Sequence, residues 1–214
     1  MGNPWEAIGL ETYEEHMRLD SVRQLQSLNA LMQRQLSACP ADTVMILGIA
    51  GGNGLEHIRS DQFRRVYGVD INEAYLNAVR ERYAQLESLE CLRIDLTTES
   101  EKLPEAQLLI ANLLIEYIGY PAFQRAVLQS APDHVSCVIQ INTDAESWVS
   151  DSPYLREFDG LDAVHHQMDA AALTDAMHEI GYADVLMETE SLPNGKALVR
   201  IDFEKASSLK GADL

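Results

Sequence analysis

Four glycines stand within the stretch ILGIAGGNGLEHI, which covers residues 46–58. Gly48, Gly51, Gly52 and Gly54 follow an apolar run and precede residues with helical spacing. A strand that passes through a glycine-rich turn into a helix is a common place for a nucleotide-like cofactor, because glycine has no Cβ and lets a ligand reach the main chain. A tight turn that binds no ligand is the alternative interpretation.

An acidic residue closes the next apolar run. Asp70 follows residues 66–69, and a carboxylate at the end of that strand can accept hydrogen bonds from both ribose hydroxyls of such a cofactor. The alternative is that Asp70 caps a helix beginning near Asn72.

Two histidines lie in a long connection near the end of the chain. His165 and His166 belong to residues 143–168, which also contain the aromatic residues Trp148, Tyr154 and Phe158. One histidine could serve as a base, and the aromatic side chains could wall a pocket for an apolar or cationic substrate. We therefore expect a lid or insert at 143–168. The alternative is that the histidines simply precede a helix capped by Asp169.

Alternating apolar runs and helical patterns must position these residues. Such alternation predicts crossover units and a parallel sheet covered by helices on both faces. The expected strands are residues 44–49, 66–69, 89–94, 108–111 and 135–141, and the expected helices between them are 54–60, 73–86 and 120–130.

The end of the chain has a different pattern. A helix expected at 170–180 is followed by two β-type runs, 183–190 and 196–203, which a Pro-Asn-Gly turn ending at Gly195 connects. This arrangement predicts a hairpin, so the last strand should lie antiparallel to its neighbour. Residues 205–214 have little to bury and are expected to form a flexible tail.

The beginning of the chain predicts a helical cap over residues 1–40. Helical periodicity runs from about residue 10 to 38, before Pro40, and the α/β domain is expected to span 41–204. Aromatic, histidine and methionine side chains of the cap could fold over the same pocket or simply pack at helical spacing; they are Trp5, Tyr13, His16 and Met17.

Composition excludes several classes of partner. The chain of 214 residues has 34 acidic and 16 basic residues, a net charge of −18, whereas nucleic-acid binding needs a basic face. No apolar stretch approaches the roughly 20 residues that span a bilayer, and the N-terminus lacks a signal-peptide pattern. We expect a cytoplasmic protein with a small or cationic substrate and no membrane contact; homodimerisation is left open.

Three cysteines are spread along the chain. Cys39, Cys91 and Cys137 stand singly in apolar surroundings. This spacing favours buried, reduced thiols over disulfides or a metal cluster, so no metal site is expected.

The segment VMILGIAGGNGLEHI, followed by VYGVDIN, resembles the class I S-adenosylmethionine-dependent methyltransferases. Their first motif usually runs acidic-x-Gly-x-Gly-x-Gly after strand one, and their second strand ends in an acidic residue. Gly48, Ala50 and Gly52 take the three small positions, and Asp70 takes the acidic one. Two departures stand out: Ile46 replaces the first acid, and Ala50 fits only if its φ is negative and its methyl points away from the ligand.

The resemblance implies a fold and a cofactor. The fold is α/β, a doubly wound, mostly parallel seven-stranded Rossmann-like sheet with a terminal antiparallel hairpin and an N-terminal helical cap. The cofactor is S-adenosylmethionine, and Asp95 would contact its adenine amino group, although Asp95 is also a good helix N-cap. The implied cofactor-binding residues are Gly48, Ala50, Gly51, Gly52, Gly54, Asp70, Ile71, Asp95, Leu96 and Asn112.

The resemblance also places the end of strand four beside the transferred methyl group. Asn112, Glu116 and Tyr117 are therefore candidates for substrate contact. Glu116 would be a general base, or else a helix-start acid favoured by the helix dipole. Leu113 and Leu114 stand where adenine and glutamine methyltransferases have two prolines, which argues against those acceptors.

The expected activity is S-adenosylmethionine-dependent methyl transfer to a small-molecule acceptor. A sulfonium methyl is already activated, so the enzyme must mainly align the nucleophile and exclude water. A noncatalytic S-adenosylmethionine-binding protein remains an alternative. An NAD(P)-dependent oxidoreductase is a weaker one, because Asn53 and His57 stand where the third glycine of Gly-x-Gly-x-x-Gly would fall in either register.

Overall fold

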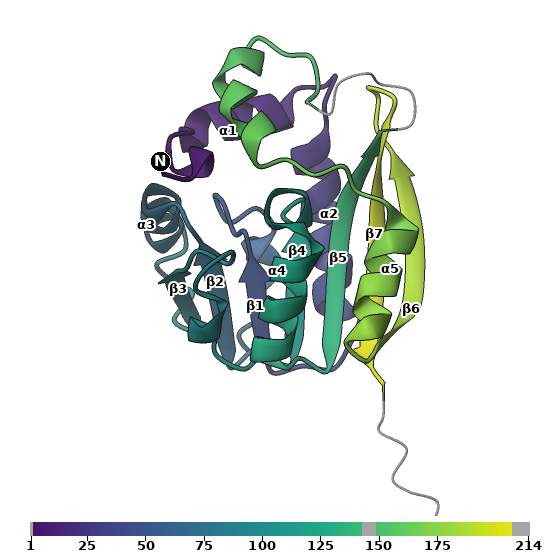
Figure 1. Ribbon diagram of the computed structural model, residues 1–214. Helices are drawn as coiled ribbons and strands as arrows, with labels where there is room; N and C mark the ends of the chain where they lie inside the picture. The colour runs from purple at the N-terminus through teal and green to yellow at the C-terminus, as the bar shows by residue number, and fades with distance from the viewer. Residues whose placement is uncertain (1, 143–148, 207–214) are drawn as a thin grey trace, which may run out of the picture.

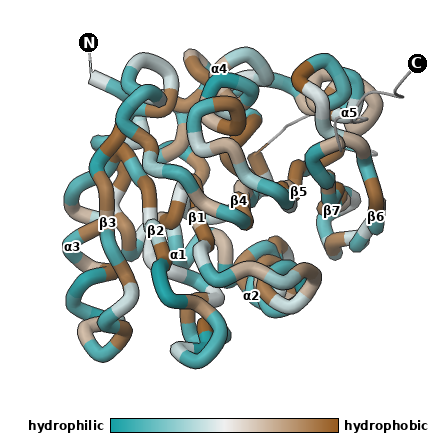
Figure 2. The backbone as a smooth tube through the Cα atoms, turned by 90° about the horizontal axis from the view of Figure 1, so that it is seen from below, coloured by the Kyte–Doolittle hydropathy of each residue, from teal (hydrophilic) through white to brown (hydrophobic). Residues whose placement is uncertain are grey.

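A computed structural model describes residues 2–142 and 149–206. Its centre is a seven-stranded sheet with the order β3-β2-β1-β4-β5-β7-β6, which is visible as a row of strands in Figure 2. The strands are β1 (Thr43–Leu47), β2 (Arg65–Asp70), β3 (Leu89–Arg93), β4 (Leu108–Asn112), β5 (His134–Asn142), β6 (Tyr182–Ser191) and β7 (Lys196–Lys205).

The directions of the strands confirm the predicted sheet. Strands β1 to β5 pair in parallel, whereas β7 is antiparallel to both β5 and β6. The turn between β6 and β7 contains Gly195 with φ +75°, and Oδ1 of Asn194 accepts a hydrogen bond of 3.2 Å from the amide of Lys196. These are the residue types that a tight hairpin requires.

Helices cover both faces of the sheet (Figures 1 and 2). The helices α4 (Ile115–Ser130) and α5 (Ala170–Glu179) lie on one face, and α2 (Gln24–Ser37) and α3 (Glu73–Arg82) pack against the other. Alternate side chains of β1 enter the two cores: Met45 and Leu47 pack with α4 and α5, whereas Val44 and Ile46 pack with α2 and α3. A strand buried on both faces reads as a continuous apolar run, which is why its period is not visible in the sequence.

Four predicted helices have different boundaries from those expected, and the one expected at 73–86 ends at Arg82. The N-terminal helix is two helices, α1 (Leu10–Arg18) and α2, separated at Arg23 with φ +55°. The helix expected at 54–60 is a single 3-10 turn, Leu55–His57. Helix α4 begins five residues before the expected start at 120, and its regular backbone is interrupted at Gly119, with φ +73°, just before Pro121. The helical period in the sequence does not reveal the interruptions at Arg23 and Gly119, because apolar residues precede and follow each of them.

A roof of short elements lies above the carboxyl ends of the parallel strands (Figure 1). It consists of the 3-10 turn Pro4–Glu6, α1 and the 3-10 segment Leu155–Ala163. Ile8, Phe158 and Leu161 form the buried centre of this roof. The described part of the expected lid, residues 149–168, therefore packs against the N-terminal elements of the roof. Trp148, with residues 143–148, lies outside the described residues.

The remaining sequence expectations have mixed outcomes. Strand β7 extends to Lys205, the first residue of the expected tail, and residues 207–214 lie outside the described residues. Cys137 is buried, but Cys39 and Cys91 are only half-buried, contrary to prediction, because they lie beside the edges of the cores. Within the described ranges, no helix is long and apolar enough to cross a membrane, and no cluster of three or more potential ligands is placed to hold a metal ion. The expected boundary at residue 40, between the helical cap and the α/β domain, stays a prediction.

Candidate functional site

A first cavity opens at the carboxyl ends of β1, β2 and β4. Its volume is about 670 Å³, open mouth included. Seven of the ten predicted cofactor-binding residues line it: Gly48, Ala50, Asp70, Ile71, Asp95, Leu96 and Asn112. The remaining wall comes from side chains that were not predicted to bind the cofactor: Asn3, Trp5, Tyr13, Tyr75, Ile94, Leu113, Leu114, Tyr117 and Ile118. The parallel strands bring the predicted residues together because the carboxyl ends of these strands meet at one edge of the sheet, whereas Asn3, Trp5 and Tyr13 come from the N-terminal segment.

Asp70 connects two loops at the floor of this cavity. Its Oδ2 accepts a hydrogen bond of 2.9 Å from the amide of Ala50, and its Oδ1 accepts one of 2.9 Å from the amide of Asn72. Burial raises the pKa of Asp70, although backbone hydrogen bonds from Asn72, Ala50 and Ile71 oppose that rise. These amides do not use all of the roughly four acceptor positions of a carboxylate, so acceptor capacity remains for a ligand. Asp70 does not cap α3, because Asn72 caps it by accepting from the amides of Ala74 and Tyr75.

Ala50 has a left-handed backbone conformation with φ +46°. The condition under which alanine would fit this position without strain, a negative φ, is therefore not met. The hydrogen bond from its amide to Asp70 holds this conformation, which costs a residue with a Cβ about 1–2 kcal/mol. Gly48 also has a positive φ, +68°, and a Cβ there would lie 3.1 Å from Cδ1 of Leu114.

Three of the predicted glycines lie outside the first cavity. A Cβ on Gly51 would collide with Glu14 and Arg82, whereas one on Gly52 or Gly54 would approach Tyr83 or Met32. These glycines allow α1, α2 and α3 to pack closely around the loop. Close packing therefore gives these three glycines a structural role, and their contact with a cofactor stays a prediction.

Asp95 and Asn112 line the first cavity from strand ends. Oδ1 of Asp95 accepts hydrogen bonds from the amide (2.9 Å) and the hydroxyl (2.6 Å) of Thr97. The next helical element in the described structure is the 3-10 turn Ser100–Lys102 and no α-helix starts at Asp95, so the alternative of a helix N-cap is wrong. Asn112 exchanges two hydrogen bonds of 2.9 Å with the side chain of Gln35, which fixes its amide at the end of β4.

A second cavity of about 550 Å³ adjoins the first. Trp5, Tyr13, Leu113 and Tyr117 line both cavities and form the wall between them. The other side chains come from α1, α2, α4, β5 and the roof: His16, Met17, Gln24, Glu116, Gln140, Val149, Ser150, Phe158, Leu161 and His165.

Glu116 is a buried carboxyl in the second cavity. Its residue is 4% exposed, and Oε2 has no hydrogen-bond partner among the described residues. Burial raises the pKa of Glu116 to about 8, against the opposing effect of backbone hydrogen bonds from its own residue and from Gln140. Glu116 does lie in the first turn of α4, but a solvated helix-start acid would not be buried in this way.

The predicted histidines occupy different environments. His165 lines the second cavity, and burial lowers its pKa to about 4, so its imidazole is uncharged near neutral pH. His166 is exposed and lines neither cavity; its amide donates a 2.6 Å hydrogen bond to the carbonyl of Glu116. Tyr117 stays a neutral phenol, because burial raises its pKa well above its usual range.

Two polar residues that were not predicted, Gln24 and Gln140, line the second cavity beside His16 of the expected cap. His16 shares a 2.8 Å hydrogen bond between its Nδ1 and Oγ of Ser152, and burial lowers its pKa to about 4. Gln24 donates a hydrogen bond to the side chain of Gln140. Gln140 was detectable in principle, because it is a polar residue inside the otherwise apolar run of β5.

No protein-family profile matches the chain, and no curated protein sequence does. Solved structures match over most of its length. N-methyltransferase NodS from Bradyrhizobium japonicum aligns over 88% of this chain and 100% of its own, with a TM-score of 0.63 and 14% identity. Magnesium protoporphyrin IX methyltransferase from Synechocystis, with bound S-adenosylmethionine, aligns over 90% and 83%, with a TM-score of 0.59 and 10% identity. The [4+2]-cyclase SpnF aligns over 88% and 84%, with a TM-score of 0.65 and 9% identity.

These structures share with this chain an overall fold and little sequence. The chain therefore has the fold of the class I S-adenosylmethionine-dependent methyltransferases.

Proposed function

We propose that the protein binds S-adenosylmethionine in the first cavity and transfers its methyl group to a small molecule in the second. The observation that carries this proposal is the wall shared by the two cavities. Trp5, Tyr13, Leu113 and Tyr117 line both, so that two ligands bound side by side would meet at these residues. A methyl donor and its acceptor need such an arrangement.

The residues of the first cavity fit this cofactor. Asp70 has acceptor positions left for ribose hydroxyls, and Asp95 with Leu96 would hold the adenine. Gly48 and Ala50 bring the main chain to the cavity wall. The similar structure of magnesium protoporphyrin IX methyltransferase, which has S-adenosylmethionine bound, supports the assignment.

The acid absent at Ile46 has a candidate substitute in the roof. Glu14 of α1 lines a third hollow together with Ile46 and Gly51. Its carboxylate pairs with Arg82, whose Nη2 lies 2.9 Å from Oε2. We assign to Glu14 the support of the amino-acid end of the cofactor, beside the glycine loop.

The bound cofactor would supply an activated methyl group, and the chain would supply binding, orientation and exclusion of water. Trp5 and Phe158 close the second cavity from the roof side. Neutral His165 is a weak proton acceptor, whereas the carboxyl of Glu116 has a pKa near the working range of a general base. The modest volume of the second cavity and the strong negative charge of the chain both favour a small molecule over a nucleic acid.

Ligand binding gives the first test. Thermal unfolding with S-adenosylmethionine, S-adenosylhomocysteine, NAD and NADP should show stabilisation by the two sulfur compounds alone, of about 2.7 kcal/mol at a hundred times the dissociation constant. Stabilisation by a nicotinamide cofactor would instead support an oxidoreductase.

Turnover separates an enzyme from a noncatalytic binding protein. S-adenosylhomocysteine should form when acceptors are offered, and binding of S-adenosylmethionine without any turnover would favour the noncatalytic alternative. This measurement is needed because a protein with a similar structure, SpnF, is named as a [4+2]-cyclase and not as a methyltransferase.

A further inference from the structure

We propose that the acceptor is an amine and that Glu116 binds its nitrogen and accepts its proton. The inference rests on the proposed methyl transfer and adds the chemical class of the substrate. It follows from the position of one carboxyl, the charges around it and the side chains that enclose the second cavity.

One oxygen of the Glu116 carboxyl has no hydrogen-bond partner in the described structure, and a ligand could supply one. Glu116 is buried, lines the second cavity, and has no hydrogen bond at Oε2 within the described structure. A buried polar atom without a partner is costly, so an N–H donor placed in the cavity would gain a full hydrogen bond there. Its neighbour Tyr117 lies in the wall shared with the first cavity, so a nitrogen held by Glu116 would lie beside the methyl donor.

The groups around Glu116 provide no fixed positive charge at neutral pH to balance a carboxylate. On α1, His16 is uncharged, because burial lowers its pKa to about 4, and Tyr13 is a phenol whose pKa burial raises. Beyond the roof segment, His165 also has its pKa lowered to about 4 by burial. Tyr117 of α4 is neutral as well. A cationic ligand would therefore balance the charge that Glu116 gains when it ionises.

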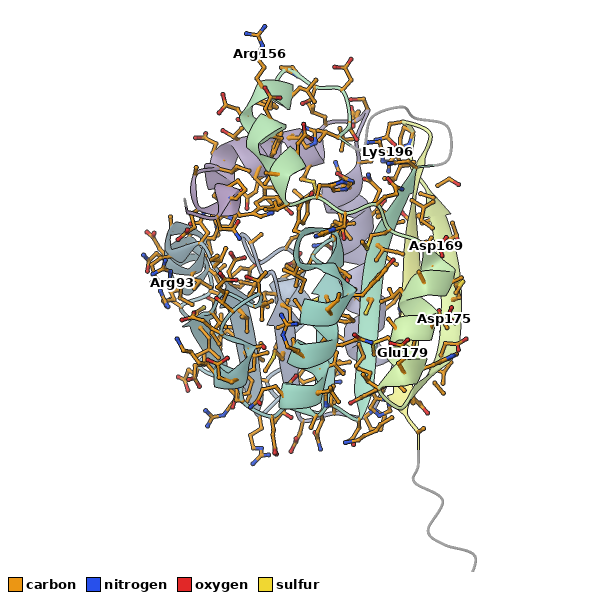
Figure 3. All side chains as sticks on the ribbon, viewed as in Figure 1. Arg93, Arg156, Asp169, Asp175, Glu179 and Lys196 are labelled. Carbon is orange, nitrogen blue, oxygen red and sulfur yellow. The ribbon has the colours of Figure 1, made fainter. Side chains whose placement is uncertain are left out.

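Lys196 and Arg156 lie near the top of the molecule but outside this cavity. Lys196, at the start of β7, is close enough to His16 and His165 to lower the pKa of each. Lys196 does not line the second cavity, and it is not among the groups that set the pKa of Glu116. Arg156 is exposed on the roof and points away from the molecule, as Figure 3 shows.

Aromatic rings enclose the same space. The ring of Trp5 lies edge-on to Tyr117, with the centroids 4.8 Å apart, and His16 lies 4.7 Å from Phe158. Aromatic faces attract ammonium groups and pack against apolar bodies. The second cavity therefore suits an amine that carries an aromatic or other apolar body of modest size.

The transfer balances with Glu116 as the proton acceptor. The carboxylate takes one proton from the bound ammonium, and this leaves a neutral amine with a free lone pair. The lone pair forms the new nitrogen–carbon bond to the methyl group while the carbon–sulfur bond breaks and its electron pair stays on sulfur. The products are a methylammonium and S-adenosylhomocysteine, and the proton on Glu116 passes to solvent when the product leaves.

Calorimetric titration with matched ligands tests the inference without turnover. The protein saturated with S-adenosylhomocysteine is titrated with an amine, an alcohol and a carboxylate on the same carbon frame: phenethylamine, 2-phenylethanol and phenylacetate, then the corresponding indolyl and cyclohexyl sets. At least one amine should bind about tenfold or more tightly than its alcohol, because a hydrogen bond to a charged group is the stronger kind. The carboxylates should bind least, because they would face Glu116.

Two variants connect the preference to the carboxyl. Glu116→Gln keeps the shape of the side chain and should abolish the preference for the amine. Glu157→Gln makes the same change of charge at an exposed position of the roof and should leave it intact. Titration near neutral pH in two buffers should also show a proton released by the wild-type protein on binding the amine, and none by Glu116→Gln.

The outcomes separate the two proposals. If S-adenosylhomocysteine does not bind, the proposed function fails. If it binds but no amine exceeds its alcohol, or if Glu116→Gln keeps the preference, the assignment of an amine is overturned while methyl transfer to another acceptor stands.

Discussion

The amide of Ala50 and the carboxylate of Asp70 form a hydrogen bond of 2.9 Å that fastens the glycine loop to the end of β2. The second carboxylate oxygen holds the amide of Asn72 at the start of α3. One side chain thus shapes the floor of the first cavity and presents acceptors to it.

Replacing Asp70 separates these two roles. Asp70→Ala should weaken binding of S-adenosylmethionine by tenfold or more, since hydrogen bonds to a charged group contribute about 1.5–3 kcal/mol. It should also lower stability, because two backbone amides lose their acceptor. Asp70→Asn keeps one acceptor and should lose affinity with a smaller loss of stability.

Calorimetry measures the affinity, and Asp175→Asn on the outer face of α5 (Figure 3) is the control for charge. Unchanged affinity in Asp70→Ala would remove Asp70 from the binding site.

The positive φ of Ala50 predicts a stabilising substitution. Ala50→Gly should raise the free energy of unfolding by about 1 kcal/mol, because glycine adopts φ +46° without the steric cost of a Cβ. Ala131→Gly should act in the same direction, because Ala131 ends α4 with φ +47°.

Ala30→Gly supplies the control for these two substitutions. Ala30 lies exposed inside α2, where glycine should lower stability by about 0.5–1 kcal/mol. Denaturant unfolding of the three variants should therefore give two increases and one decrease. Destabilisation at Ala50 would mean that its methyl group contributes packing that outweighs the strain.

The buried carboxyl of Glu116 predicts a dependence of stability on pH. Burial raises its pKa from 4.5 to about 8, so the folded protein holds a proton that the unfolded chain releases. Stability from this group is full below pH 4.5 and is lost as the pH rises toward 8. Glu116→Gln has no such titration, so its stability relative to wild type should increase over that range by a few kcal/mol, at about 1.4 kcal/mol per pKa unit.

The other buried titrating groups are common to both proteins and cancel in this comparison. His16 and His165 have lowered pKa values, so their contribution is lost as the pH falls below 6.5 toward 4. Lys196 also has a lowered pKa, about 8 instead of 10.5, and its contribution increases with pH between those values. Denaturant unfolding of wild type and Glu116→Gln at several pH values gives the difference. A difference that does not change with pH would show that Glu116 is ionised in the folded protein.

An ion pair holds the roof to the rest of the molecule. Arg82 of α3 pairs with Glu14 of α1 and donates a 3.1 Å hydrogen bond to the carbonyl of Gly51. Arg82→Gln should lower global stability by at most about 1 kcal/mol, because the arginine is largely exposed. Its larger effect should be local, as faster hydrogen exchange in residues 10–18. Arg80→Gln breaks a pair with Glu73 inside α3 and should leave that exchange unchanged.

Local sequence determined the elements and part of the first cavity. Apolar runs predicted the strands, and the Pro-Asn-Gly turn predicted the antiparallel β7. The position of Asp70 and Asp95 after apolar runs predicted that both line the cavity at the strand ends. These features depend on residues close together in the chain, and the common edge of a parallel sheet then brings the strand ends together.

Tertiary structure alone decided which residues form the second cavity. The break at Arg23 turns α1 across the sheet, and Glu116, His16 and Gln140 meet although they lie far apart in the sequence. Periodicity reports only that one side of an element is apolar; it cannot show which distant element covers that side. This covering by the roof distinguishes half-buried His165 from exposed His166, and it makes Glu116 a buried carboxyl rather than a solvated acid at the start of a helix.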